Sequence, residues 1–243
     1  MPTQPSTEKQ KKLSKTEQAK RISTTLPKFL DAVEPLYINH PLDDICEGNA
    51  FRVLVGCIIS LRTKDEVTIP ACERLFPKYD TPADFLKLSV EQVEQLIYPA
   101  GFYKTKARTI LEACQVLIDQ YDSQVPDTIE ELMKLKGVGR KTANLVVGLG
   151  HRLPAICVDI HVHRICNRLG VLQTATPDET EFALRDHLLP AYWAKINKLM
   201  VLYGRDICRP IGAWCDVCTV TQFCQKVDVK SRKPLKIKSQ PAP

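Results

Sequence analysis

A short glycine motif carries the clearest chemical pattern of the chain. Leu135 is followed by Lys-Gly-Val-Gly-Arg and then by Lys141. A Gly-x-Gly hairpin lets backbone N–H groups approach an anion closely, and the N-terminus of the helix behind it adds partial positive charge. A phosphate group suits this arrangement best. The motif therefore predicts a phosphate site at a hairpin that opens a helix.

Lys141 falls in the first turn of that predicted helix. The helix dipole disfavours a second positive charge, so together with partial burial it should lower the pKa of this lysine and free an amine nucleophile. Asp159 follows 18 positions later and is expected to cap the next helix. Taken alone, Lys141 could be an ordinary surface lysine and Asp159 could be only a helix cap. Together with a phosphate site, an amine and a carboxylate suggest chemistry at a sugar carbon of nucleic acid.

Ten cysteines occur in the chain, and four of them cluster near its C-terminal end. The cluster consists of Cys208, Cys215, Cys218 and Cys224. Their spacing, C-x6-C-x2-C-x5-C, predicts a metal site that could hold zinc or a [4Fe–4S] cluster. Zinc sites usually use two short C-x2-4-C pairs, so the single C-x2-C pair favours the iron–sulfur cluster. The other six cysteines are scattered and are interpreted as small buried side chains.

Composition narrows the class of protein but does not define it. The chain has 243 residues, a formal net charge of +6 and 44% hydrophobic residues, which fits a globular protein with a polyanionic partner without requiring one. Its longest apolar run, residues 53–61, is too short to cross a membrane. The N-terminal stretch lacks the apolar segment of a secretory signal.

Helical periodicity dominates between two polar, lysine-rich ends. Residues 1–21 and 229–243 are predicted to be disordered basic arms. The segments with helical spacing are 51–60, 64–75, 90–97, 105–121, 128–135, 140–147, 179–188 and 193–203. The glycine motif lies between two of these segments, which gives a helix–hairpin–helix.

The hairpin motif, the Val158-Asp159-Ile160-His161 run, the Arg164–Arg168 run and the four-cysteine spacing together resemble the endonuclease III family of helix–hairpin–helix DNA glycosylases. The resemblance covers roughly residues 25–228. It implies an all-α, two-lobed protein with a six-helix barrel at 44–153. Residues 22–43 and 154–228 would form a second lobe that carries a [4Fe–4S] cluster, with DNA bound between the lobes.

The resemblance also implies an activity in base excision repair. The enzyme would flip out an oxidised pyrimidine, remove it, and cleave the strand 3′ of the abasic site by β-elimination. Lys141 would be the nucleophile at C1′, and Asp159 would activate it or stabilise the cationic sugar. The DNA-binding residues would be Arg62, Phe102, Gly137, Val138, Gly139 and Arg140.

Two of these DNA-binding residues stand in loops away from the hairpin. Phe102 matches a position where the family places an apolar wedge, although its sequence context suits a core residue equally well. Arg62 stands where the family commonly has Gln, which enters the space left by the flipped nucleotide. Arginine pairs well with guanine, so the preference for the opposite base is expected to differ.

The expected partner is double-stranded DNA with damaged bases or abasic sites, bound by a monomer. The expected location is the cytoplasm, in association with the nucleoid and not with a membrane. Two alternatives remain at this point. One is a monofunctional mismatch glycosylase, although such relatives lack a lysine at position 141. The other is a helix–hairpin–helix DNA-binding module without activity, whose four cysteines hold zinc.

Overall fold

The computed structural model describes residues 13–37 and 48–232, and every regular element within them is a helix. The predicted all-α fold is therefore confirmed. The α-helices are α1 (Lys15–Val33), α2 (Ala50–Ser60), α3 (Asp65–Leu75), α4 (Pro82–Phe85), α5 (Val90–Ile97), α6 (Tyr103–Tyr121), α7 (Ile129–Leu132), α8 (Arg140–Leu145), α9 (Ile160–Leu169), α10 (Pro177–His187) and α11 (Trp193–Asp206).

Most of these helices begin where a short polar side chain can accept a hydrogen bond from the first turn. Such a cap satisfies one of the backbone N–H groups that a helix leaves without a partner. At α5 the cap is reciprocal, because the Gln92 side chain also accepts a bond from the Ser89 N–H. The N-cap residues that accept in this way are Ser14, Asn49, Thr81, Ser89, Thr128, Asp159 and Thr176.

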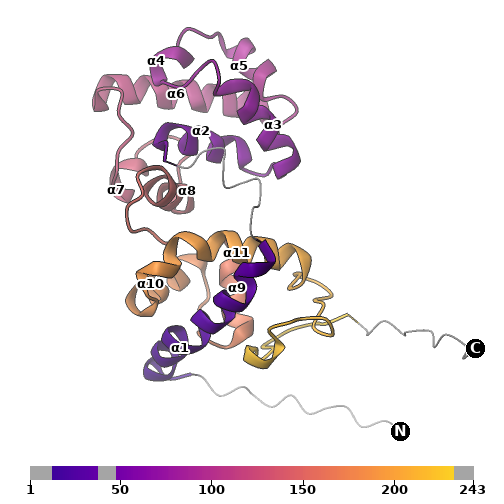
Figure 1. The fold of residues 1–243 in the computed structure, drawn as a ribbon. Helices are drawn as coiled ribbons and strands as arrows, with labels where there is room; N and C mark the ends of the chain where they lie inside the picture. The colour runs from indigo at the N-terminus through magenta and orange to yellow at the C-terminus, as the bar shows by residue number, and fades with distance from the viewer. Residues whose placement is uncertain (1–12, 38–47, 233–243) are drawn as a thin grey trace, which may run out of the picture.

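Two separate hydrophobic cores organise the helices. The first core runs from Phe51 to Ala155 and unites α2 to α8. The second core unites α1 with α9, α10 and α11, and it begins again at Ile156. Figure 1 shows these helices as two groups, so the chain passes from one core to the other between adjacent residues just before α9.

Helix α8 is shorter than the predicted helix and continues as a π-helical turn, Val146–Gly150. This segment packs closely on α2. A Cβ atom on Gly150 would lie 2.5 Å from the Cα atom of Ala50, so only glycine permits the contact. The close contact fixes α8, and with it the hairpin, against the first core.

The prediction of a disordered arm over residues 1–21 is wrong for its last part. Helix α1 begins at Lys15, and the backbone N–H of Leu13 donates to the Gln173 side chain at 2.9 Å. The lysine-rich composition concealed a helix whose buried positions start at Ile22 and recur with helical spacing. Residues 1–12 lie outside the described part of the chain.

The prediction of a disordered tail from residue 229 is also wrong where the structure describes it. Ser231 forms an isolated bridge with Ala213, and Arg232 makes an ion pair with Asp216 at 3.0 Å. The Arg232 guanidinium also lies 4.1 Å from the centre of the Trp214 ring. These contacts tie the end of the described chain to the cysteine-rich loop, and residues 233–243 lie outside the description.

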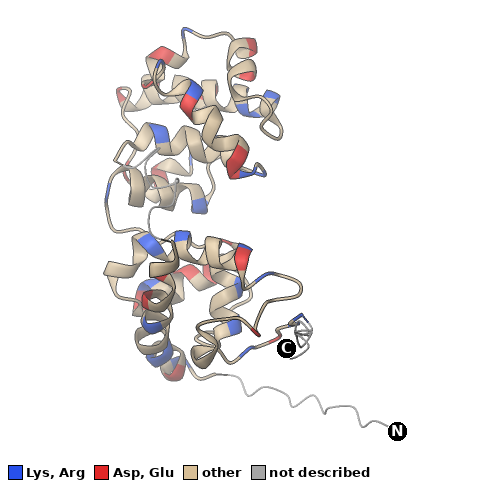
Figure 2. Ribbon diagram, turned by 45° about the vertical axis from the view of Figure 1, so that its right-hand side comes forward, with Lys and Arg blue, Asp and Glu red and all other residues tan. Residues whose placement is uncertain are grey.

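Charged residues of both signs are spread over both groups of helices, as Figure 2 shows. None of the helices in the described part of the chain has the length and apolar character that a membrane crossing needs.

Candidate active site and metal centre

The hairpin between α7 and α8 has the tight form that its glycines predict. The Val138 N–H donates to the Leu135 carbonyl at 3.1 Å, so the turn itself uses this N–H group. Gly137 has a φ of +80°, and a Cβ atom there would lie 2.8 Å from the methyl group of Thr109. In the described residues, the N–H groups of Gly137 and Gly139 make no hydrogen bond. The predicted phosphate site is therefore left with these two glycine N–H groups.

Lys141 and Asp159 meet across the junction of the two cores. The Lys141 Nζ atom lies 3.6 Å from Asp159 Oδ2, although the two residues belong to different helices. The lysine side chain is 48% exposed and the aspartate side chain 9% exposed. The structure thus brings the two predicted catalytic residues together, with the amine open to a ligand and the carboxylate largely buried.

The backbone of α9 holds the Asp159 carboxylate in place. Its Oδ1 atom accepts hydrogen bonds from the N–H groups of His161 and Val162 at 2.8 and 3.1 Å. The predicted role of Asp159 as a helix cap is confirmed. Because the cap uses Oδ1, the Oδ2 atom remains turned toward Lys141. A capped carboxylate beside an exposed amine is an arrangement that can exchange protons with a nucleophile.

Arg140, a predicted DNA-binding residue, has partners inside the protein. Its Nε and Nη2 atoms donate to the Glu181 carboxylate at 2.9 and 3.0 Å. Glu181 also accepts from Arg185 at 2.9 Å and from Asn144 at 3.2 Å, and its side chain is 4% exposed. These bonds join α8 to α10 and so connect the two cores through Arg140, the residue that precedes Lys141. A contact of Arg140 with DNA stays a prediction.

We expect Glu181→Ala to destabilise the protein by about 3 kcal/mol, because removing one partner of a buried ion pair leaves the other charges uncompensated. Urea unfolding measures this change. Asp186→Ala is the matched control, since Asp186 is an exposed acid on the same helix and should shift the unfolding free energy by less than about 0.5 kcal/mol. Equal unfolding curves for the two variants would show that Glu181 does not connect the cores.

Arg62 and Phe102 come from two different loops and lie side by side. The Arg62 guanidinium lies 5.8 Å from the centre of the Phe102 ring. Phe102 is 64% exposed, which excludes the alternative that it is a core residue. The position of both residues on the surface is compatible with the predicted insertion into DNA, which stays a prediction.

Two buried residues of this region were not identified from the sequence. Glu181 with Arg185 has the spacing of an ordinary surface ion pair, and Lys106 lies in an ordinary amphipathic helix. Burial lowers the pKa of Lys106 to about 8. Their roles depend on partners that lie far away in the sequence, which are Arg140 and Asn144 for Glu181 and the loop at residues 59–63 for Lys106.

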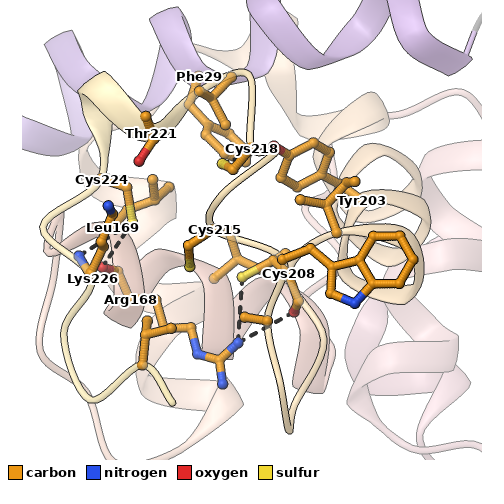
Figure 3. Close-up of a pocket in the computed structure, with 16 residues that line it drawn as sticks. Phe29, Arg168, Leu169, Tyr203, Cys208, Cys215, Cys218, Thr221, Cys224 and Lys226 are labelled. Atoms are coloured by element: carbon orange, nitrogen blue, oxygen red, sulfur yellow. Dashed lines mark hydrogen bonds between the residues drawn. The ribbon is translucent and has the colours of Figure 1, made fainter. Parts of the chain in front are cut away.

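The four clustered cysteines line one hollow of the second core, as Figure 3 shows. Apolar side chains of Phe29, Leu169 and Val220 complete its wall. Arg168 Nη1 donates to the sulfur of Cys208 at 3.4 Å. The hollow therefore combines four sulfur donors with a positively charged hydrogen-bond donor in an apolar surrounding.

The four cysteine sulfurs of this hollow are the donors that either zinc or a [4Fe–4S] cluster would use. Among the described residues, no three His, Cys, Asp or Glu side chains are close enough together to hold one ion. The four cysteines nevertheless line one shared hollow. Burial raises the pKa of the Cys224 thiol to about 11, whereas binding to a metal requires the thiolate.

Comparisons with known proteins agree with this geometry. Residues 55–190 match the family model described as HhH-GPD superfamily base excision DNA repair protein. The chain is 46% identical to Endonuclease III of Thermotoga maritima over 179 residues, which cover 74% of this chain and 84% of that protein. The chain is also similar to two solved structures, a non-covalent Endonuclease III–DNA complex and a trapped Endonuclease III–DNA covalent intermediate. Each is 33% identical in sequence and superposes with a TM-score of 0.74 over 88% of this chain. The match covers 96% of the chain in the non-covalent complex and 97% of the chain in the trapped intermediate.

The chain is therefore a helix–hairpin–helix repair protein of the HhH-GPD superfamily. Its helical fold places a glycine hairpin before a lysine that pairs with an aspartate. Within this superfamily, the chain belongs to the endonuclease III family. The family predicted from the sequence motifs is confirmed.

Proposed function

We propose that this protein is a bifunctional DNA glycosylase and AP lyase that acts in base excision repair as a monomer. It removes oxidised pyrimidines from double-stranded DNA and cleaves the strand 3′ of the resulting abasic site. The observation that carries the proposal is the exposed Lys141 amine at 3.6 Å from the Asp159 carboxylate. Similarity to an Endonuclease III trapped as a covalent DNA intermediate supports a covalent step.

The reaction begins with the unprotonated amine of Lys141. Its nitrogen bonds to C1′ of the flipped nucleotide, and the bond from C1′ to the base breaks with its electron pair leaving on the base, which takes up a proton. The sugar ring then opens, because the nitrogen lone pair forms a C=N bond as the C1′–O4′ bond breaks. O4′ keeps the electron pair and takes up a proton, which leaves a protonated Schiff base between Lys141 and C1′. Loss of a proton from C2′ then expels the 3′ phosphate, and water releases the lysine.

Asp159 supports both halves of this sequence from a fixed position. Its Oδ2 atom accepts a proton from the Lys141 ammonium before attack and passes this proton to the departing base. The carboxylate that results is again negatively charged and stabilises the cationic sugar. The Gly137 and Gly139 N–H groups hold phosphates that flank the lesion. DNA phosphates would in this way position C1′ over the amine.

A [4Fe–4S] cluster fits the hollow of the second core and would be held by Cys208, Cys215, Cys218 and Cys224. When bound, the cluster supplies a cross-link between sulfur atoms of a loop that has little regular structure of its own. Arg168 of α9 and Arg232 near the end of the described chain both contact this loop. The cluster would therefore keep the part of the second core around the loop ordered.

We expect the purified protein to be brown, with a broad absorption at about 400 nm and equal amounts of iron and acid-labile sulfide. Cys215→Ser should lose most of this absorption, whereas Cys72→Ser, at a buried cysteine of the first core, should keep it. A colourless wild-type protein that contains zinc would contradict the cluster and favour the alternative metal.

The function is tested on a labelled duplex that carries thymine glycol, with the undamaged duplex as control. We expect base release and strand cleavage without added alkali, with an unsaturated aldehyde at the 3′ end of the product. Base release that needs alkali for cleavage would indicate a monofunctional glycosylase. Binding with no base release would indicate a DNA-binding module.

A further inference from the structure

Lys106 is a buried lysine whose partners are all uncharged oxygen atoms. The residue lies in the first turn of α6 and is 5% exposed. Its Nζ atom donates to the carbonyls of Ile59 and Leu61 at 2.7 and 2.6 Å and to the Thr63 hydroxyl at 2.7 Å. An ammonium group has three N–H donors, so these three bonds use all of them.

These bonds join the two loops that carry Arg62 and Phe102. Leu61 and Thr63 flank Arg62 directly, whereas the Lys106 N–H donates to the Phe102 carbonyl at 3.0 Å. Thr63 also links the two loops directly, because its hydroxyl accepts a hydrogen bond from the Gly101 N–H at 3.0 Å. The Lys106 side chain therefore binds the loop of Arg62 to the first turn of α6, and the backbone of the same residue bonds to Phe102 at the start of that turn.

Both surface residues adopt a backbone conformation that L-residues rarely take. Arg62 has a φ of 53° and Phe102 a φ of 58°. Residues in this region are strained and persist only where their surroundings hold them. The loops are also in close contact, because a Cβ atom on Gly101 would lie 2.9 Å from the Arg62 carbonyl oxygen. The bonds of Lys106 supply part of what holds the two strained residues.

We propose that Lys106 is a positioning residue that holds Arg62 and Phe102 as one preformed pair, which enters the base stack together when the damaged nucleotide leaves it. This inference rests on the proposed function. An insertion pair that is ordered before binding loses less conformational freedom on binding, so more of the contact energy is available to hold the extruded state. The three hydrogen-bond partners of the Lys106 side chain include neither Lys141 nor Asp159.

A positioning defect should lower base excision from a duplex but not Schiff-base formation on single-stranded DNA, whereas a general loss of structure would lower both activities. Excision of a damaged base from a duplex requires insertion into the stack. Schiff-base formation at an abasic site in single-stranded DNA has no stack to enter and depends on Lys141 and Asp159. A defect in positioning should therefore appear with the duplex and be absent with the single strand.

The test compares Lys106→Met and Thr63→Val with wild type on both substrates. Lys106→Met removes the ammonium at nearly constant volume, and Thr63→Val removes only the hydroxyl. We expect each variant to lower excision from the thymine glycol duplex at least about tenfold, the effect of one lost hydrogen bond to a charged group. Borohydride trapping on a single-stranded abasic oligonucleotide should stay within about twofold, a margin of less than 0.5 kcal/mol.

Matched controls separate charge and fold from positioning. Lys104→Met removes the same charge from an exposed place on the same helix, and Thr63→Ser keeps the hydroxyl. Both should excise from the duplex like wild type. If Lys106→Met does not fold, Thr63→Val alone decides. Equal losses on both substrates, or full excision by Thr63→Val, would overturn the proposal, whereas a wild-type protein inactive on both substrates would overturn the proposed function.

Discussion

Lys141→Gln should bind duplex DNA that carries an abasic site and leave it uncut. Glutamine is polar and only one atom shorter than lysine but has no nucleophilic amine, so no Schiff base can form and strand cleavage should fall to the limit of detection. The glycine N–H groups of the hairpin remain, so the complex should still form in a gel-shift assay, weakened slightly by the loss of one charge.

The matched control is Lys136→Gln, in the same hairpin. The Lys136 side chain is 71% exposed and pairs with Glu112 at 2.7 Å, an exposed ion pair that contributes little to stability. This variant loses the same charge beside the DNA but keeps the amine of Lys141. Cleavage should therefore continue at nearly the wild-type rate. Residual cleavage by Lys141→Gln, at a rate similar to that of the control, would show that another group is the nucleophile.

Asp159→Asn should separate the two roles of this residue. Asparagine caps helices about as well as aspartate, so its side-chain oxygen can still accept from the N–H groups of α9 and the fold should be kept. The carboxylate that faces Lys141 is lost, however, and with it the proton acceptor and the negative charge near the sugar. We expect single-turnover base excision to fall about 10²- to 10⁴-fold.

Asp159→Ala completes this comparison because it removes the cap as well. Its activity should fall as far as that of the asparagine variant, and its unfolding free energy should be lower by about 1 kcal/mol. Full activity of Asp159→Asn would contradict the account, since the aspartate would then be a helix cap and nothing more.

The hairpin and the helix caps could be predicted because they depend on neighbouring residues. Gly137 needs a positive φ that glycine provides, and Asp159 caps the helix that follows it directly. The same local reasoning failed at α1, since a lysine-rich composition conceals a helix whose apolar positions are few but regularly spaced. Helix α1 is held by the second core, which is formed mainly by residues more than a hundred positions away.

The contacts that complete the site could not be predicted, because they join distant parts of the chain. Arg140 was expected to face DNA, and the structure turns its guanidinium to Glu181, 41 positions away. Lys106 has the sequence context of a surface lysine, yet its partners lie 43 to 47 positions earlier. Periodicity locates a residue on a helix but does not identify the loop that packs over it.

The most direct test of the account is to trap wild-type protein on an abasic duplex with borohydride and map the adduct by proteolysis and mass spectrometry. Reduction converts the Schiff base into a stable amine, so the modified peptide contains the nucleophile. The account predicts one adduct, on Lys141. An adduct on a different lysine, or no adduct despite strand cleavage, would contradict it.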